Sequence, residues 1–197
     1  MPIIKLSLVG QAVYLEPLSM AHAEGLFAVG QHQFDWQFLP RGCFTDIHDV
    51  MRWITEAQTY VAKGEHIAFT IFDSQTHEIV GSTRYLAIRP NDHVVEIGWT
   101  WLSPEAQRSR INTEMKFLML RHAFEQMNMR RVELKTDLRN LRSQRAIERL
   151  GAAREGVFRK HMCVQNDFQR DTVFYSVIDD EWFRVKAKLL ERLERVH

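Results

Sequence analysis

The chain has 197 residues, 45% of them hydrophobic, and its 26 lysines and arginines are almost balanced by 25 acidic residues, giving a formal net charge of +1. This length suits one globular domain, residues 1–197, with a sizeable core. The near-neutral charge argues against a strongly basic nucleic-acid-binding protein, so we expect no nucleic-acid partner.

The N-terminal segment and the cysteines indicate the compartment. MPIIKLSLVG lacks the longer apolar core and the small-residue cleavage site of a signal peptide, and no apolar run approaches membrane-spanning length. Cys43 and Cys163 are far apart, and the nine histidines include no H-x-x-x-H pair. We therefore expect a cytoplasmic protein with no disulfide framework, no metal and no membrane partner.

The first half of the chain predicts a strand, two helices and three strands. Their ranges are 13–15, 20–29, 47–63, 66–72, 79–88 and 94–102. Between the two helices lies an aromatic loop, QHQFDWQFLPRGCF, with Pro40 and Gly42 as helix breakers.

The second half predicts a helix, a strand, a helix, a closing hairpin and an amphipathic C-terminal helix. Their ranges are 113–126, 132–136, 142–150, 156–164 with 172–178, and 182–197. The order of the elements along the whole chain predicts a mixed α/β sheet.

The segment VVEIGWTWLSPEAQRSRINTE carries the most chemical information. Strict alternation along the strand places one set of side chains toward the core and the other away from it, namely Val95, Ile97, Trp99 and Trp101 against Glu96, Gly98, Thr100 and Leu102. The second set puts a carboxylate beside a residue with no side chain, which leaves room for a ligand.

The loop from Gln107 to Asn112 leads into the next helix. Its small and polar residues favour anion binding, because the first amides of a helix lack intrahelical acceptors and the helix dipole adds positive charge. A diphosphate suits such a site. The alternative is that Asn112 or Thr113 merely caps the helix.

This run resembles the central motif of the GNAT acetyltransferase superfamily, Q/R-x-x-G-x-G/A, in which loop amides hold the coenzyme A pyrophosphate. Its surroundings resemble the RimJ/RimL-like branch at Glu96-Ile97-Gly98-Trp99, Gln107-Arg108, Ile111-Asn112-Thr113-Glu114, Asn140-x-x-Ser143, Leu150-Gly151-Ala152 and Glu155-Gly156. The element order matches from Val13 to about Ile178. The resemblance implies a mixed, mostly antiparallel central sheet flanked by helices.

The resemblance also implies an N-acetyltransferase that uses acetyl-CoA as co-substrate and needs no metal. The acceptor would be a primary amine, either a protein N-terminus or a small amine, attacking directly in a ternary complex. The residues it assigns to cofactor binding are Trp101, Leu102, Gln107, Arg108, Ser109, Arg110, Ile111, Asn112, Thr113 and Asn140.

Arg110 departs from the family pattern, because it occupies a position where the family normally has glycine. Glycine permits positive φ and close approach of the backbone to phosphate. Arginine either obstructs that turn or pairs its guanidinium with a phosphate. This departure keeps open a rival function, a non-catalytic acyl-CoA-binding module of the same fold.

Two residues are the catalytic candidates. Glu96 is the expected base, since an amine attacks a thioester only after losing its proton; the alternative is a structural ion pair with Arg84 or Lys135. Ser143 is the expected proton donor to the coenzyme A thiolate, and the alternative is a serine that only stabilises its helix start. Asn140 likewise reads as a cofactor contact or as an N-cap.

The acceptor site and the basic stripe have weaker signals. Trp36 and Phe38, in the aromatic loop with Phe34 and Phe44, are expected to bind substrate, although such loops also seal core edges. The acid that ribosomal-protein-acetylating relatives carry near Met162 is missing, and only His161 is adjacent.

The stripe formed by Arg139, Arg142, Arg145 and Arg149 is a solvated face or a contact to the coenzyme's 3′-phosphate. A homodimer is compatible with the sequence, which leaves the oligomeric state open.

Overall fold

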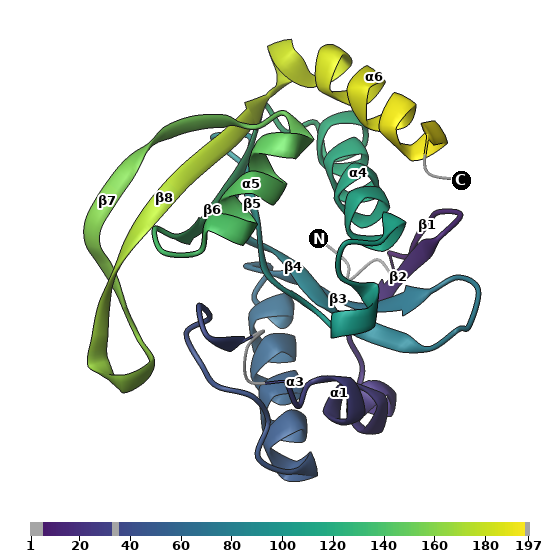
Figure 1. Cartoon of the computed structure of the whole chain (residues 1–197), viewed down its shortest axis with the longest axis vertical. Helices are drawn as coiled ribbons and strands as arrows, with labels where there is room; N and C mark the ends of the chain where they lie inside the picture. The colour runs from purple at the N-terminus through teal and green to yellow at the C-terminus, as the bar shows by residue number, and fades with distance from the viewer. Residues whose placement is uncertain (1–5, 33–35, 196–197) are drawn as a thin grey trace.

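The computed structural model describes residues 6–32 and 36–195 and contains one eight-stranded sheet with the order β1-β2-β3-β4-β5-β6-β8-β7 (Figure 1). The strands are β1 (Leu8–Val9), β2 (Val13–Pro17), β3 (Ile67–Asp73), β4 (Ile79–Arg89), β5 (Val94–Leu102), β6 (Arg131–Asp137), β7 (Ala153–Val164) and β8 (Phe168–Ile178). The α-helices are α1 (Ala23–Val29), α3 (Ile47–Ala62), α4 (Arg110–Glu125), α5 (Leu141–Leu150) and α6 (Asp179–Arg195). The short 3₁₀ helices are η1 (Met20–His22), η2 (Pro104–Ala106) and η3 (Gln165–Asp167).

The expected mixed, mostly antiparallel sheet is confirmed. Within the described residues β5 and β6 form the parallel pair, joined through α4, and the other neighbouring strands are antiparallel. A parallel pair needs a crossover connection, and the amphipathic helix after β5 supplies it. Within those residues, no helix combines the length and apolar composition needed to cross a bilayer.

The sheet separates two apolar cores. One contains the inward faces of α4, α5 and α6 with β-strand residues such as Val95, Ile97 and Leu134. The other lies under α1 and α3 and contains Trp53 and Trp101. Helix α3 forms where the sequence predicts it, because its apolar residues recur at helical spacing and the Asp46 side chain caps it by accepting from the Asp49 amide, 2.8 Å away.

Strand β5 contains a bulge that the alternation pattern did not predict. Ser82 pairs with Trp101 and Arg84 with Gly98, so two steps on β4 match three on β5, and Trp99 has φ 50°. An extra residue shifts the alternation by one. After the bulge Leu102 joins Val95 in the α4 core, whereas Trp101 turns into the α3 core and Trp99 shares the Arg84 guanidinium with Trp53. The expected faces are therefore wrong from Trp99 onward.

Strands β5 and β6 part soon after they pair. Their register runs from Val94 with Arg131 to Glu96 with Glu133 and ends there. Beyond Glu96 the two strands diverge (Figure 1), and the cavity described below as the candidate site lies at this opening in the sheet.

Several element boundaries differ from the sequence-based prediction. Helix α4 begins at Arg110, three residues before the predicted start, because Ser109 caps it. The predicted helix at 20–29 is a 3₁₀ turn followed by α1, and β1 was too short to show a pattern. The C-terminal helix begins at Asp179 and packs on α4 through Trp182, whose ring stacks on Phe124 at 5.1 Å. The C-terminal hairpin, with Asn166 at φ 58° beside its turn, is as predicted.

Candidate active site

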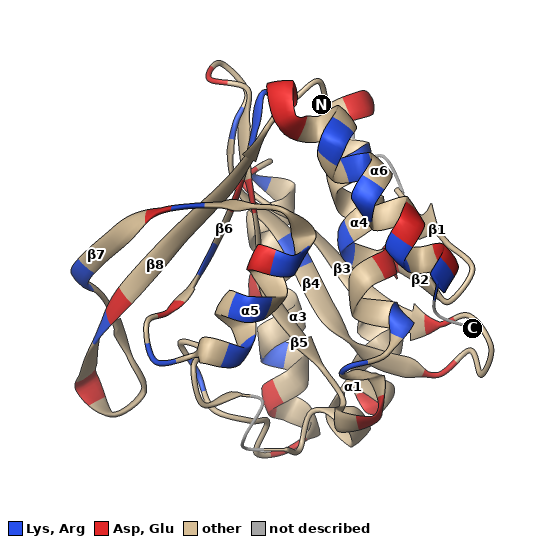
Figure 2. Cartoon of the chain, turned by 45° about the horizontal axis from the view of Figure 1, so that its top comes forward, with Lys and Arg blue, Asp and Glu red and all other residues tan. Residues whose placement is uncertain are grey.

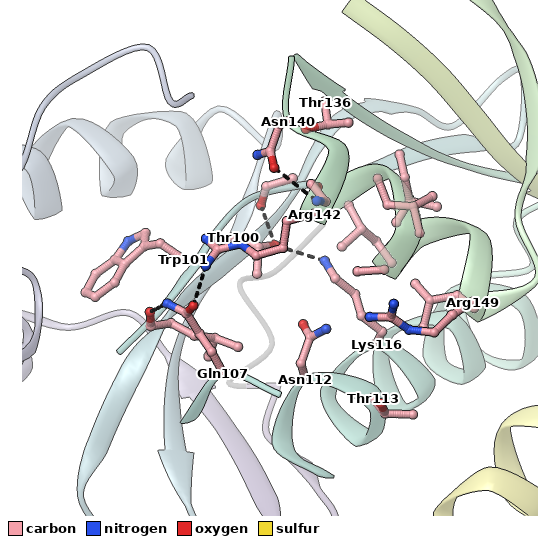
Figure 3. Close-up of a pocket in the computed structure, with 18 of the residues that line it drawn as sticks. Thr100, Trp101, Gln107, Asn112, Thr113, Lys116, Thr136, Asn140, Arg142 and Arg149 are labelled. Carbon is pink, nitrogen blue, oxygen red and sulfur yellow. Dashed lines mark hydrogen bonds between the residues drawn. The ribbon is translucent and has the colours of Figure 1, made fainter. Parts of the chain in front are cut away.

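A cavity of about 520 Å³ occupies the opening between β5 and β6, a volume typical of small-molecule sites (Figure 3). Its walls come from β5, β6, the segment leading into α4, the first turns of α4, and α5. Nine of the ten residues expected to bind a cofactor line it: Trp101, Leu102, Gln107, Arg108, Ser109, Arg110, Asn112, Thr113 and Asn140. The exception is Ile111, whose side chain is buried in the α4 core.

Gln107 links the loop before α4 to strand β5 and to helix α5. Its Nε2 donates to the Leu102 carbonyl over 2.9 Å, and its Oε1 accepts from Arg142 Nη1 at 2.6 Å (Figure 3). The glutamine of the motif therefore ties the end of β5 to the start of α5, which fixes the shape of the cavity mouth.

The N-terminus of α4 faces this cavity. Ser109 is the N-cap: its hydroxyl accepts from the Ile111 amide at 3.2 Å and donates to the Ala106 carbonyl at 2.7 Å. Asn112 and Thr113 are not caps, as one alternative held, but lie inside the first turns and line the cavity. Helix α4 thus directs the positive end of its dipole to the site.

Arg110 does not occupy the strained turn that its glycine counterpart suggests. It is the first residue of α4, and its Nη2 donates to Gln11 Oε1 at 2.9 Å. The left-handed conformation in this loop belongs to Arg108, with φ 59°. Of the two alternatives for Arg110, the obstructed positive-φ turn is therefore wrong, because a helical position requires no glycine.

The cavity is strongly electropositive. Lysines and arginines from five elements and from the loop before α4 line it, and its described lining residues include no aspartate or glutamate. These basic residues are Arg108, Arg110, Lys116, Lys135, Arg142, Arg149, Arg170 and Arg192. Figure 2 shows basic bands on α5 and α6, the helices that carry three of them. Such a lining attracts a polyanion.

Helix α5 presents one face to the cavity, as its spacing predicted. Ser143, Ala146, Ile147 and Leu150 all line it. Asn140 is the N-cap, because its Oδ1 accepts from the Ser143 amide at 3.0 Å, and it lines the cavity as well. The capping role is therefore present, and a cofactor contact is geometrically compatible with it.

A second cavity of about 480 Å³ adjoins the first between β4, β5, β6, β7 and β8. Glu96 lines it, is 3% exposed, and accepts from Lys135 Nζ at 2.8 Å. Burial raises the pKa of the Glu96 carboxyl, and the Lys135 ion pair offsets part of that rise. Lys135 lines both cavities, so it marks their junction.

Arg84, the other partner considered for Glu96, has a different environment. Its guanidinium lies over the rings of Trp53 and Trp99, 4.8 and 5.1 Å from their centroids. Of the two ion pairs considered, the structure contains the one with Lys135.

His161 enters the second cavity, which its place in the sequence did not reveal. A bulge between Phe158 and Met162 shifts the β7 register, and Lys160 has φ 48°. His161 Nδ1 lies 3.2 Å from Thr172 Oγ1, and burial with nearby Lys135 and Arg170 lowers the pKa of the imidazole.

The two aromatic residues expected to bind substrate lie in different places. Trp36 is 1% exposed, packs against Trp101 and donates from Nε1 to the Gly30 carbonyl, so it belongs to the core. Phe38 lines the first cavity, with the Arg139 guanidinium 5.7 Å from its ring. Phe34 lies outside the described residues.

Lys116 is the functional candidate that the sequence reasoning missed. It is 7% exposed, lines the first cavity, and donates from Nζ to Thr100 Oγ1 at 2.9 Å (Figure 3). Burial lowers its pKa to about 7. The available signal was its place on α4, four residues after Asn112 and four before Leu120, which puts a lysine on the inward face.

The sequence of the chain is similar to those of known proteins. A model of the acetyltransferase (GNAT) domain matches residues 12–153. YjcK of Bacillus subtilis (strain 168), named a probable N-acetyltransferase, is 26% identical over 177 residues, 87% of this chain and 97% of that protein. YnaD of the same organism is 30% identical, but the match spans 46% of this chain and about half, 52%, of YnaD.

The fold is similar to those of solved structures along most of the chain. A GCN5-related N-acetyltransferase from Brucella melitensis has a TM-score of 0.90 and 29% identity, over 96% of this chain and 86% of that one. RimL, a ribosomal L7/L12 α-N-protein acetyltransferase, shares the fold with a TM-score of 0.78 at 20% identity, over 88% of this chain and 94% of that one. The GNAT model alone spans more than half of the sequence, and the chain therefore belongs to the GNAT family of acetyltransferases.

Proposed function

We propose that this protein is an N-acetyltransferase that moves the acetyl group of acetyl-CoA to a primary amine by direct attack in a ternary complex. The observation that carries the proposal is the junction of two unlike cavities at Lys135. An electropositive cavity meets a buried carboxylate, Glu96, through an opening in the sheet. One side suits a polyanionic cofactor and the other suits proton removal.

The first cavity would hold coenzyme A. The start of α4, with Asn112 and Thr113, would receive the diphosphate, since helix N-termini bind phosphate. Arg149 and Arg192 would meet the 3′-phosphate, because they line the same wall and Arg192 Nη1 donates to the Arg149 carbonyl at 2.7 Å. Bound acetyl-CoA supplies the activated thioester.

The end of β5 offers a backbone donor. The Ser103 amide donates to the Val80 carbonyl on β4 at 2.8 Å, so the alternating pattern of the ladder directs the neighbouring Leu102 amide away from β4. We infer that this amide polarises the thioester carbonyl as an oxyanion-type donor. The bulge at Trp99, where φ is 50°, precedes Leu102 on the same strand and shapes the backbone there.

Glu96 would accept the proton of the acceptor amine. A buried carboxyl with a raised pKa is a stronger base than an ordinary one, and the Lys135 contact keeps it ionised. The amine would reach it from the second cavity, which His161 also lines. Ser143 lines the first cavity and is the proposed proton donor to the departing thiolate.

The acceptor would be the α-amine of a protein or a small primary amine. The second cavity carries three carboxylates and three cations beside Phe158, His161 and Phe174, so it is not a purely acidic site for polycations. The similarity to RimL, whose name states that it acetylates a ribosomal protein, supports the first class.

Two cysteines without a disulfide, Cys43 and Cys163, support a reducing, cytoplasmic setting.

The test combines equilibrium binding with turnover. We expect acetyl-CoA to bind saturably in calorimetry and to raise the melting temperature, because a ligand of the native state stabilises it. Thiol release should follow when peptides with free N-termini or a panel of small amines are added. Saturable binding with no thiol release on any acceptor would favour the non-catalytic acyl-CoA-binding module. Absence of binding up to millimolar acetyl-CoA would reject the proposal.

A further inference from the structure

Lys116 is a buried amine whose only hydrogen-bond partner among the described residues is a neutral hydroxyl. Its Nζ donates to Thr100 Oγ1 at 2.9 Å, Thr100 lies 2.8 Å from Thr83 Oγ1, and the Thr83 hydroxyl donates to Met119 Sδ at 3.7 Å. Thr100 Oγ1 accepts from the lysine, and its own proton can go to Thr83 Oγ1 or to the Gly98 carbonyl, 3.5 Å away. One N–H of Lys116 is therefore used, and the rest of the amine is left for the cavity.

The charges around Lys116 do not hold it as an ammonium. Within the described residues no carboxylate lies within ion-pair distance of its Nζ; Glu96 acts on it only through space and opposes the effect of burial. The other charged groups lining this cavity are cations: Lys135 on β6, Arg142 and Arg149 on α5, Arg192 on α6, Arg170 on β8, with Arg108 and Arg110 at the helix start. Burial lowers the pKa of the Lys116 amine to about 7 and so favours the free amine.

A free amine in the cavity that takes acetyl-CoA has a chemical consequence. We propose that Lys116 Nζ is a self-acetylation site, modified by the acetyl-CoA bound in its own cavity; this rests on the proposed function. The amine nitrogen attacks the thioester carbonyl carbon, a C–N bond forms and the C–S bond breaks. The amine proton passes to the departing thiolate, so the products are N-acetyl-lysine and coenzyme A thiol, and no redox partner is needed.

Lys135 supplies the internal contrast, because it lines the same cavity. Its Nζ is 2.8 Å from Glu96 Oε2, in an ion pair that requires the ammonium form. An ammonium has no electron pair for attack on a thioester. Acetylation should therefore select Lys116 over Lys135. The acetyl amide would also fill part of the cavity, so the modified protein should bind coenzyme A more weakly.

The experiment is incubation of the full chain with isotopically labelled acetyl-CoA, followed by peptide mapping in a mass spectrometer. We expect one acetyl group at Lys116, formed at least ~10-fold faster than at Lys135, because a near-neutral pKa exposes far more free amine at pH 7 than an ordinary lysine does. The rate should rise as the pH passes through about 7, where Lys116 loses its proton, and should then level off. Excess coenzyme A should suppress the reaction.

Two variants complete the design. Lys116→Arg keeps a long basic side chain and removes the nucleophilic amine, so it should lose the adduct, whereas the exposed Lys188→Arg should retain it. Saturable acetyl-CoA binding without modification of Lys116 would overturn this inference and leave the proposed function standing. Labelling that excess coenzyme A does not suppress would also overturn it, because it would reflect bulk chemistry. Failure of acetyl-CoA to bind would reject both.

Discussion

The two cavities at the β5–β6 opening share Lys135 but differ in charge. The first is lined by eight lysines and arginines and, among its described residues, by no carboxylate. In the second, Glu96, Glu133 and Glu155 stand against three cations, and all three are in ion pairs. An unbalanced positive lining holds a polyanion, whereas a balanced one fixes the position of a base. Under the proposed function, cofactor binding and proton removal take place on opposite sides of one opening.

The same contrast holds for the two buried ionisable groups at the site. Glu96 and Lys116 are 3% and 7% exposed, and burial moves the pKa of each toward neutrality. Glu96 has an ion-pair partner, and Lys116 has a threonine hydroxyl. Burial alone therefore does not set the protonation state; the partner decides how much charge survives.

The largest expected effect tests the proton-removal side. Glu96→Gln should lower turnover by about 10²–10⁴-fold, the scale of a positioned acid–base group, and should change coenzyme A affinity little. In the wild type, turnover should fall as pH drops through the Glu96 pKa, which burial places above that of an ordinary glutamate. Steady-state kinetics across pH measures both.

Glu133→Gln is the matched control for that variant, because Glu133 lines the same cavity but pairs with Arg89 and Arg131. It should retain most of the turnover. Normal rates in folded Glu96→Gln protein would assign Glu96 to a structural ion pair with Lys135.

The second prediction concerns the stability cost of Lys116. Its folded-state pKa, about 7, lies below its ordinary value of 10.5, so the unfolded chain binds more protons between those two pH values. The free energy of unfolding should therefore rise with pH across that window. Lys116→Met should remove the rise and stabilise the protein at pH 7 by about 1–3 kcal/mol, after loss of one hydrogen bond.

Chemical denaturation at a series of pH values measures this effect, with the exposed Lys188→Met as control. If the wild type and Lys116→Met show parallel pH dependences, Lys116 is charged in the folded protein, and the contrast with Glu96 disappears.

The third prediction tests the cation lining. Arg149→Ala should weaken coenzyme A binding by about 3–10-fold, between the values of an exposed ion pair and a charge-assisted hydrogen bond. The loss should shrink at high salt, because exposed charges are screened. Arg145→Ala is the control on the same helix, since Arg145 is exposed and is not among the described cavity residues. Calorimetric titration measures both affinities. Equal losses of affinity in the two variants would mean that the net charge of the protein, and not a contact from Arg149, causes the effect.

The smallest expected effect separates two arginines of the motif loop. Arg108 has φ 59°, so Arg108→Gly should raise stability by up to about 1 kcal/mol by relieving a left-handed conformation. Arg110 is helical, so Arg110→Gly should lower stability by about 0.5–1 kcal/mol and should not tighten coenzyme A binding. Thermal unfolding and calorimetry of both proteins check this. Tighter coenzyme A binding by Arg110→Gly would support the hypothesis that Arg110 obstructs the turn.

Local pattern was sufficient for much of this protein. The periodicity of α3 and α5, the hairpin turn at Asn166 and the cap at Asn140 depend on neighbours within one or two turns, and each lies where the sequence predicts it. The motif from Gln107 to Thr113 could likewise be recognised from the sequence, because its residues form one short segment, and all of them except Ile111 line the first cavity.

Tertiary structure decided the rest, because bulges and partners join distant segments. The β5 bulge at Trp99 exists only through pairing with β4, and it exchanged the faces of Trp101 and Leu102. The β7 bulge brought His161 to Glu96's cavity. The partner of Glu96 came from the neighbouring strand, and the burial of Lys116 came from α4 packing across β5. Alternation and spacing report which side a residue faces in an ideal element, whereas its charge state depends on atoms that only the folded chain brings within a few ångströms.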